Sequence, residues 1–356
     1  MRVGVPKEIK NQEHRVGLTP AAVRTLSLRG HRVLVEASAG AGVGITDADY
    51  RAAGAEIVNC ASGVYACADL VVKVKEPQPG ECRLLRADQT LFAYLHLAAA
   101  PEQAGLLRDS GCTAIAYETV TDELGGLPLL APMSEVAGRL SVQAAAVSLE
   151  KSNGGLGLLL AGVPGVPPAQ VAVIGGGVVG TNAARLALGL GAEVTVLDRS
   201  LARMRELDQL FGPRLKTLYS NEEVVEWAAL QADVVIGAVL IPGAAAPKLV
   251  SEAVVSQMKP GAVVVDVAID QGGCFETSRP TTHDDPTYSW QGIVHYCVAN
   301  MPGAVPRTST QALVNATTPY VAALADKGTE QAIAEDRHLA AGVNVRAGEI
   351  TLPGFG

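Results

Sequence analysis

Chemically versatile side chains recur at the ends of predicted strands in this sequence. His96 lies in TLFAYLHL and Lys75 in DLVVKVKEP, while Asp270 follows VVVDVAI and Asn300 ends CVAN. Doubly wound α/β sheets bind their ligands outside the carboxyl ends of the strands. An imidazole at that edge can move protons near neutral pH, and a carboxylate can orient water or an amine. The set therefore predicts a ligand site that supports proton transfer.

Each of these side chains also has an ordinary structural explanation. A lysine at a strand end is usually solvated, an aspartate before glycines usually forms a turn, and Asn300 could cap a helix. His96 could be a core histidine with a hydrogen-bond partner. Lys73 and Asp266, on the same predicted strands, are further candidates with the same alternatives. The recurrence of polar groups at equivalent strand ends favours the functional interpretation.

Arg15 is a candidate for binding a carboxylate. It lies in the loop KNQEHRVGLTP, between the first predicted strand and its helix. A guanidinium there could hold a carboxylate through two parallel hydrogen bonds. The alternative is a surface arginine that pairs with Glu8 or Glu13.

The stretch VAVIGGGVVG predicts a dinucleotide-binding turn between a strand and a helix. Gly175, Gly177 and Gly180 have the GxGxxG spacing, which permits a tight turn, the approach of a pyrophosphate, and close packing of helix on strand. Asp198 ends the next strand, EVTVLD, where a carboxylate binds ribose hydroxyls and repels a 2′-phosphate. The unit therefore favours NAD over NADP, although Arg199 weakens this preference slightly. The alternative for Asp198 is a helix-capping acid.

The elements that would position these groups form two α/β units. Strand and helix patterns alternate up to about residue 130 and again from residue 170 to about 303, which indicates parallel sheets with helices on both faces. Long helical patterns cover residues 133–155 and 308–328, and Pro319 is expected to kink or restart the second one.

These patterns predict two doubly wound Rossmann-like domains, joined by the long helices, with a cleft between them as the default ligand site. The substrate domain is expected to comprise residues 1–130 plus 306–356. The NAD-binding domain, including the linking helix, is expected to comprise residues 131–305.

Composition excludes several classes of protein. The formal net charge is −8 and there is no basic cluster, which argues against a nucleic-acid partner. The six cysteines show no CxxC pair and no metal-ligand spacing, as expected for reduced thiols in the cytosol. No signal peptide is recognisable, and no apolar run approaches the about 18 residues that cross a bilayer. We therefore expect a cytoplasmic protein with no membrane partner.

Several motifs spread over the whole chain resemble the alanine dehydrogenase family. They are MRVGVPKEIKNQEHRVGLTP, KVKEP, LHLAA, LLAPMSEVAGR, IPGAAAPKLV, DVAIDQGGCFE and CVANMPGAVPRTST. The nearest relative of that family is the NAD-binding subunit of proton-translocating transhydrogenase. The resemblance implies reversible, NAD-dependent oxidation of L-alanine to pyruvate and ammonia by a homohexamer.

The resemblance also implies roles for individual residues. Arg15 and Lys75 would hold the substrate's carboxylate and carbonyl, and His96 and Asp270 would be the acid/base pair. Which of that pair takes the first proton is open. Further substrate contacts are expected from Tyr94, Met133 and Asn300. The expected cofactor-binding residues, besides the three glycines and Asp198, are Ser134, Val178, Val179, Arg203, Ser220, Val239, Leu240, Val267, Ala268, Ile269, Asp270, Arg279, Val298, Ala299, Asn300 and Met301.

Some members of the family bind magnesium through an acid that matches Glu118 and a histidine near the tail. Lys327 stands at that second position here, so no metal is expected. Three alternatives to an alanine dehydrogenase are considered. They are a transhydrogenase subunit that holds NAD without substrate chemistry, an NAD-sensing regulatory or structural protein, and a related amino-acid dehydrogenase with a larger substrate.

Overall fold

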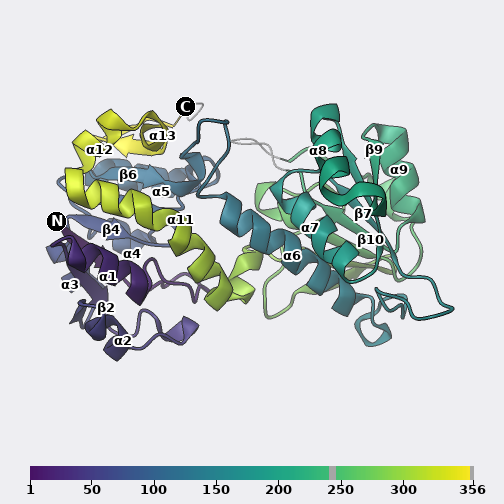
Figure 1. Ribbon diagram of the computed structural model, residues 1–356, viewed down its shortest axis with the longest axis horizontal. Coiled ribbons are helices and arrows are strands. Elements are labelled where there is room, and N and C mark those ends of the chain that lie inside the picture. Colours follow the sequence, from purple (N-terminus) through teal and green to yellow (C-terminus); the bar gives the residue numbers. More distant parts are fainter. Residues whose placement is uncertain (240–245, 353–356) are drawn as a thin grey trace. The chain divides into compact units, whose positions relative to one another are not determined.

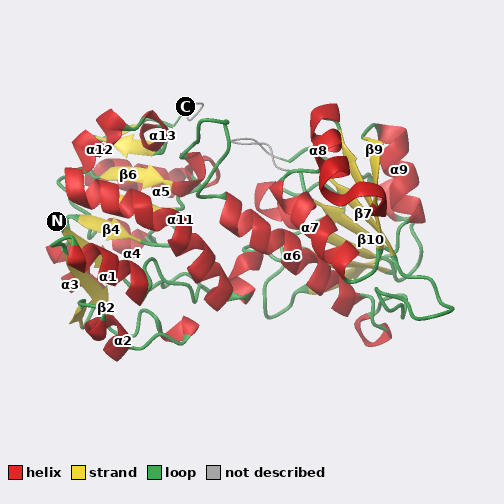
Figure 2. Ribbon diagram, viewed as in Figure 1, coloured by secondary structure: helices red, strands yellow, loops and turns green. Residues whose placement is uncertain are grey.

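The computed structural model describes residues 1–239 and 246–352 (Figure 1). The chain divides into two compact units. Unit 1 is formed by Met1–Met133 together with Val305–Gly356, and unit 2 by Ser134–Ala304. Figure 2 shows helices alongside the strands of each unit. The predicted fold class, two α/β units with mainly parallel sheets, is confirmed.

Unit 1 contains an eight-stranded sheet in the order β15-β14-β6-β5-β4-β1-β2-β3. The strands from β1 to β6 are parallel, while β14 and β15 add an antiparallel edge. Their bounds are β1 Arg2–Val5, β2 Arg32–Glu36, β3 Glu56–Val58, β4 Leu70–Val72, β5 Thr90–Ala93, β6 Thr113–Ala116, β14 Val343–Arg346 and β15 Glu349–Ile350.

The helices of unit 1 begin and end at the signals expected from the sequence. Thr46 caps α2 in a capping box with Asp49, and α5 ends at Gly111 in the left-handed conformation, with φ 72°. The helices are α1 Pro20–Leu28, α2 Asp47–Ala52, α3 Ala61–Cys67, α4 Pro79–Cys82, α5 Pro101–Ser110, α11 Pro306–Lys327, α12 Thr329–Glu335 and α13 Arg337–Ala340.

Unit 2 contains a seven-stranded sheet in the order β12-β13-β11-β10-β7-β8-β9. Only β12 is antiparallel to its neighbour among these strands. The strands are β7 Gln170–Ile174, β8 Glu193–Asp198, β9 Leu215–Tyr219, β10 Val234–Gly237, β11 Val263–Asp266, β12 Thr287–Trp290 and β13 Ile293–Tyr296. The helices are α6 Ala131–Ser148, which begins in unit 1, α7 Val178–Gly189, α8 Leu201–Phe211, α9 Glu222–Gln231 and α10 Glu252–Val255.

Three details differ from the sequence-based expectations. β4 ends at Val72 and β5 at Ala93, so these strands stop earlier than their apolar patterns suggest. The edge strands β12, β14 and β15 make both sheets mixed. The predicted restart at Pro319 is wrong, because α11 runs through it without a break.

In the turn before the proline of α11, Thr318 Oγ1 donates to the carbonyl of Val314 at 2.6 Å. Among the described helices, none combines the length and the apolar composition that a membrane span requires.

Candidate functional site

Two candidate residues stand together at the carboxyl edge of the unit 1 sheet. β4 and β5 are parallel neighbours, with Val72 opposite Phe92, and the chains stay hydrogen-bonded beyond the strands through Tyr94 N and the Val74 carbonyl, at 3.1 Å. Lys75 follows β4 and His96 follows β5 at this edge. The structure therefore brings the predicted lysine and imidazole to one place.

His96 is not a core residue, because 41% of its side chain is exposed. Its backbone adopts the left-handed conformation, with φ 50° and ψ 38°, directly after the strand. The ring of Tyr94 stacks on the imidazole, with centroids 5.7 Å apart and planes 7° apart. The buried Tyr94 hydroxyl donates to the carbonyl of Leu129 at 2.6 Å, so this ring is a fixed support for His96. The interpretation of His96 as a core histidine is wrong.

The pKa of His96 is lowered well below 6.5. Desolvation is the largest cause, followed by the positive charges of Lys75, Lys10 and Arg15. The lowered pKa favours the neutral form of the imidazole, which is the form that can accept a proton.

Lys75 provides a direct test of this electrostatic arrangement. Because its charge opposes protonation of the imidazole, we expect Lys75→Gln to raise the pKa of His96 toward 6.5. The measurement is an NMR titration of the histidine ring carbons, with His96→Asn used to assign the signal. Arg29→Gln, an exposed charge change elsewhere in unit 1, should leave the His96 titration in place. An unchanged or lower pKa in Lys75→Gln would contradict the electrostatic coupling.

Arg15 is buried, with 2% of its surface exposed, so the interpretation as a surface arginine is wrong. Pairing with Glu13 is nevertheless correct. Arg15 Nε and Nη2 donate to the two Glu13 carboxylate oxygens at 2.7 and 2.6 Å, and Nη1 lies 3.0 Å from the Met133 sulfur. The Glu13 pair fixes the plane of the guanidinium, while Met133 contacts its opposite edge.

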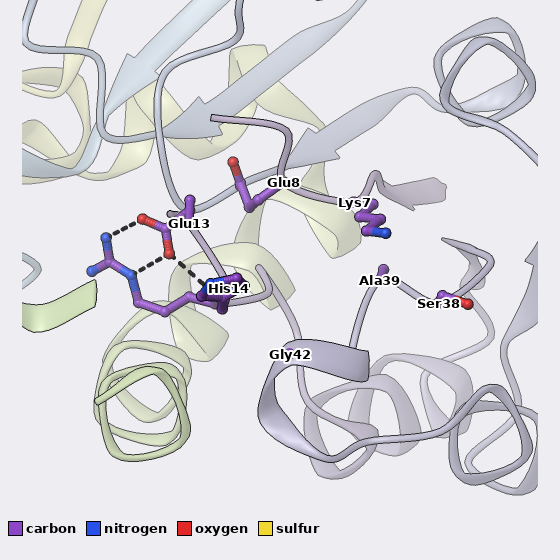
Figure 3. A pocket seen from close by; sticks show the side chains of 8 residues that line it. Lys7, Glu8, Glu13, His14, Ser38, Ala39 and Gly42 are labelled. Atoms are coloured by element: carbon purple, nitrogen blue, oxygen red, sulfur yellow. Dashed lines mark hydrogen bonds and ion pairs between the residues drawn. The ribbon is translucent and has the colours of Figure 1, made fainter. Parts of the chain in front are cut away.

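A small hollow lies beside this ion pair in unit 1 (Figure 3). A Cβ at Gly42 would lie 2.7 Å from the His14 carbonyl, so the close approach of the two loops requires glycine. The hollow is lined by Lys7, Glu8, Glu13, His14, Arg15, Ser38, Ala39 and Gly42.

Lys73 belongs to a buried ionic network rather than to a solvated strand end. Its ammonium lies 3.1 Å from Glu8 and 3.0 Å from Glu81, and the side chains of all three are at most 4% exposed. Glu8 also accepts hydrogen bonds from the backbone N–H groups of Val74, at 2.7 Å, and Lys75, at 3.4 Å. The network therefore holds the segment that carries Lys75. Sequence reasoning missed this role of Glu8, because its partners lie more than 60 residues away in the chain.

Lys75 itself is 8% exposed, so the solvated-lysine interpretation is wrong for both lysines of VVKVK.

The glycine turn of unit 2 connects β7 to α7. Gly175 has φ 102°, a conformation that favours glycine, and a Cβ at Gly180 would lie 1.8 Å from the Gly175 carbonyl. By contrast, a Cβ at Gly177 would meet no atom of the described residues within 4 Å. Gly177 is the N-cap of α7, and the first N–H groups of a helix have no acceptor within the helix. The turn therefore has the shape required to admit a phosphate.

Asp198 and Arg203 both bind the backbone of Gly176, one at its N–H and the other at its carbonyl. Asp198 Oδ2 accepts from Gly176 N at 2.7 Å, and Oδ1 accepts from Ser200 N at 2.7 Å. Arg203 Nε donates to the Gly176 carbonyl at 2.6 Å, and its Nη2 to Thr181 Oγ1 at 2.5 Å. These contacts hold the glycine turn against the end of β8. Asp198 does not cap α8, because Ser200 supplies that cap.

The remaining candidates in unit 2 lie in α6 or follow strands of the same sheet. Arg279 places its guanidinium 4.2 Å from the centroid of the Tyr288 ring. Ser134 lies in the first half of α6, Val178 and Val179 begin α7, Ser220 follows β9, Val239 follows β10, and Val298, Ala299, Asn300 and Met301 follow β13. Leu240 lies outside the described residues.

Asp266 and Asp270 have different environments. Asp266 is fully buried and accepts hydrogen bonds from Ala268 N, Cys274 N and Ser278 Oγ, at 3.1, 2.8 and 2.6 Å. It organises the loop after β11 and is not available to a ligand. Asp270 is exposed on the short 3-10 helix Val267–Gln271. Of the two aspartates, only Asp270 remains a candidate for chemistry.

The described part of the chain contains no group of three or more His, Cys, Asp or Glu side chains that could hold a metal ion. Lys327 forms an ion pair with Glu335 at 2.6 Å. The Glu118 carboxylate accepts hydrogen bonds from the backbone at Leu95 and His96.

Comparisons with known proteins agree with the motifs. Residues 4–137 match the family described as alanine dehydrogenase/PNT, N-terminal domain, and residues 141–353 match its C-terminal domain. The chain is 62% identical to an alanine dehydrogenase of Halomonas elongata, over 99% of this chain and 95% of that one. It is 57% identical to an alanine dehydrogenase of Bacillus subtilis, over 99% and 93% of the two chains.

Comparison with solved structures also finds an alanine dehydrogenase. A structure named L-alanine dehydrogenase superposes with a TM-score of 0.95 at 55% identity, covering 99% of this chain and 97% of that one. A transhydrogenase from Sinorhizobium meliloti superposes with a TM-score of 0.85 at 26% identity, covering both chains fully. The family predicted from the sequence motifs is confirmed, and the chain belongs to the alanine dehydrogenase/PNT family.

Proposed function

We propose that the protein is an NAD-dependent L-alanine dehydrogenase, which interconverts L-alanine with pyruvate and ammonia. The observation that carries this proposal is the meeting of a neutral imidazole, His96, with Lys75 at one sheet edge. The high identity to proteins named alanine dehydrogenase supports it. We further propose that it acts in the cytoplasm as a homohexamer, without nucleic-acid or membrane partners.

In this proposal unit 2 binds NAD and unit 1 binds the substrate. The open space beside Gly177 and the first turn of α7 would receive the pyrophosphate. Asp198 would accept the ribose hydroxyls through lone pairs beyond those that its two backbone contacts use. Its negative charge disfavours the 2′-phosphate of NADP, so we expect a preference for NAD. The other unit 2 candidates would line the remaining cofactor surface.

The substrate carboxylate would bind the Nη1–Nη2 edge of Arg15, because Glu13 already uses the Nε–Nη2 edge. Lys75 would hold the second polar group of the substrate, the carbonyl of pyruvate. Met133, which contacts the same guanidinium, would lie against the methyl group, with Asn300 as a further contact. The cation pair thus distinguishes a 2-oxo or 2-amino acid from a neutral carbonyl compound.

NAD, when bound, would accept the hydride that leaves Cα of alanine. The lowered pKa favours the neutral form of His96, so it can take the proton from the ammonium group or from the water that attacks the resulting iminium carbon. Asp270, which is exposed in unit 2, would orient that water or the amine. Either His96 or Asp270 fits the role of first proton acceptor. Lys75 and Arg15 hold Cα in a fixed position throughout.

A substrate panel tests the proposal most directly. The purified protein is mixed with single amino acids and NAD or NADP, and with 2-oxo acids, ammonia and NADH, while NADH absorbance is followed. We expect turnover with L-alanine and NAD, and the reverse with pyruvate. NAD binding without any turnover would instead support a transhydrogenase subunit or an NAD-sensing protein. Preference for a bulkier amino acid would support a related dehydrogenase.

Arg15→Lys should raise the KM for pyruvate about 10- to 100-fold, while the KM for NAD stays unchanged. A lysine supplies a point charge where the arginine supplies a planar fork, and it also loses the second bond to Glu13. Steady-state kinetics with each substrate varied separately measure both constants. Arg29→Lys is the matched control, because Arg29 is an exposed residue paired with Asp326. An unchanged KM for pyruvate would refute the carboxylate role.

A further inference from the structure

Glu118 lies next to the backbone of His96, and the two residues follow the neighbouring strands β6 and β5. β5 and β6 are parallel, with Ala93 opposite Ala116, and β6 continues into the short 3-10 helix Tyr117–Thr119. Glu118 Oε1 accepts from His96 N at 2.6 Å and from Leu95 N at 3.1 Å, and Oε2 lies 3.3 Å from Leu95 N. One carboxylate therefore captures two successive backbone N–H groups.

These hydrogen bonds to Glu118 explain why the chain leaves the sheet before His96. The left-handed conformation, φ 50° and ψ 38°, costs a residue with a Cβ about 1–2 kcal/mol. Successive N–H groups that point the same way form a concave anion site, and hydrogen bonds to a carboxylate are stronger than those between neutral groups. Glu118 thus offsets the cost of a conformation that follows β5 and leaves the imidazole partly exposed at the sheet edge.

The Glu118 carboxylate lies closer to the backbone N–H of His96 than to the imidazole nitrogen. Glu118 Oε1 lies 3.8 Å from Nδ1 of the imidazole but only 2.6 Å from His96 N. The ring is supported separately by the stacked Tyr94. The hydrogen bonds from the backbone to Glu118 and the stacking of the ring on Tyr94 together determine where the imidazole lies.

We infer that Glu118 is a positioning residue for His96, and that it acts as a hydrogen-bond acceptor for the backbone at residues 95 and 96. It takes no proton from the substrate. This inference rests on the proposed role of His96 in alanine oxidation.

The test compares Glu118→Gln with Glu118→Ala. Glutamine keeps an amide oxygen that can accept both N–H groups, so kcat should stay within about fivefold of the parent value and its pH profile should keep its shape. Alanine removes the acceptor, and displacement of the imidazole should lower kcat about 100-fold. The affinity for NADH, measured by fluorescence, should be unchanged in both variants because unit 2 is untouched.

Asp122→Ala is the matched control. Asp122 also accepts backbone hydrogen bonds, from Leu124 N at 2.9 Å and Gly126 N at 2.7 Å, and these belong to its own turn. Its removal should leave kcat unchanged. If Glu118→Gln loses as much activity as Glu118→Ala, or if Glu118→Ala keeps full activity, the inference is overturned. If Glu118→Ala does not fold, the glutamine variant alone decides, because near-complete loss of its kcat overturns the inference.

A second readout separates this inference from the proposed function. The NMR signals of the His96 ring report its environment whether or not alanine is a substrate. They should move or broaden in Glu118→Ala and stay in place in Asp122→Ala. An unmoved signal overturns the positioning role, whereas a parent protein that does not oxidise alanine overturns only the proposed function.

Discussion

His96→Asn is expected to lower kcat for alanine oxidation by about 10²- to 10⁴-fold, the range over which a positioned acid or base accelerates a reaction. The side chain is 41% exposed, so its replacement should leave the thermal unfolding midpoint nearly unchanged. The KM for NAD should also stay the same, because the glycine turn belongs to unit 2. Steady-state kinetics, thermal unfolding and NADH binding test these three expectations.

His31→Asn is a suitable control for this experiment. His31 directly precedes β2, at the amino edge of the same parallel sheet, and its ring lies 2.8 Å from Asp326. The control should keep full activity, since the carboxyl edge is where Lys75 and His96 meet. Two outcomes would contradict the catalytic role of His96. One is parent-like kcat in His96→Asn, and the other is loss of folding without a specific loss of turnover.

The glycine turn could be predicted from the sequence because its determinants are local. Gly175, Gly177 and Gly180 lie within one strand-turn-helix unit, and the spacing itself specifies which position needs positive φ and which needs close packing. The order of elements was equally readable, and it gives the two mainly parallel sheets. Both features depend on residues that are close together in the sequence.

The ends of β4 and β5 could not be predicted, because distant carboxylates determine them. Glu8 accepts a hydrogen bond from Val74 N, which lies 66 residues away in the chain. Glu118 accepts hydrogen bonds from Leu95 N and His96 N, which lie about 22 residues away. An apolar run gives no sign that its last N–H groups have a partner other than the adjacent strand. The apolar pattern of VVKVK therefore suggested a strand that includes both lysines, although β4 ends at Val72, before them.

The burial of Arg15 and Asp266 was also hard to predict from the sequence. Each was a polar residue in a segment that could be exposed, and each is buried against hydrogen-bonding partners. A single sequence shows that a charged residue is present but does not show which residue compensates its charge. The network around Lys73 is the strongest case, because three charges there are buried together.

Lys73→Ala is expected to destabilise unit 1 by about 3–5 kcal/mol, the cost of leaving buried charges without their counterion. Glu8 and Glu81 both lie within 3.1 Å of the Lys73 ammonium, and they would face each other without it. Burial already raises the pKa of Glu8, and the Lys73 charge opposes that rise. The thermal unfolding midpoint of the variant should fall on the order of 10 °C.

The pH dependence of this defect distinguishes lost charge compensation from lost packing. With Lys73 absent, the pKa of Glu8 rises further above its unfolded value, so the folded state binds a proton that the unfolded state has released. Stability of the variant relative to the parent must then fall as pH rises from the folded-state pKa of Glu8 in the parent, which is already raised, toward the higher folded-state pKa in the variant, and it must recover as pH is lowered below that interval. A cavity left by the missing side chain would give a deficit independent of pH.

Two further variants complete the design. Lys216→Ala removes an exposed lysine that lies 3.4 Å from Glu193, and it should cost less than about 1 kcal/mol. The triple variant Lys73→Met, Glu8→Gln, Glu81→Gln removes all three charges and should recover much of the stability lost in Lys73→Ala. If the triple variant is no more stable than Lys73→Ala, or if the deficit of Lys73→Ala is the same at pH 5 and pH 8, charge compensation is not what holds Lys73 in unit 1.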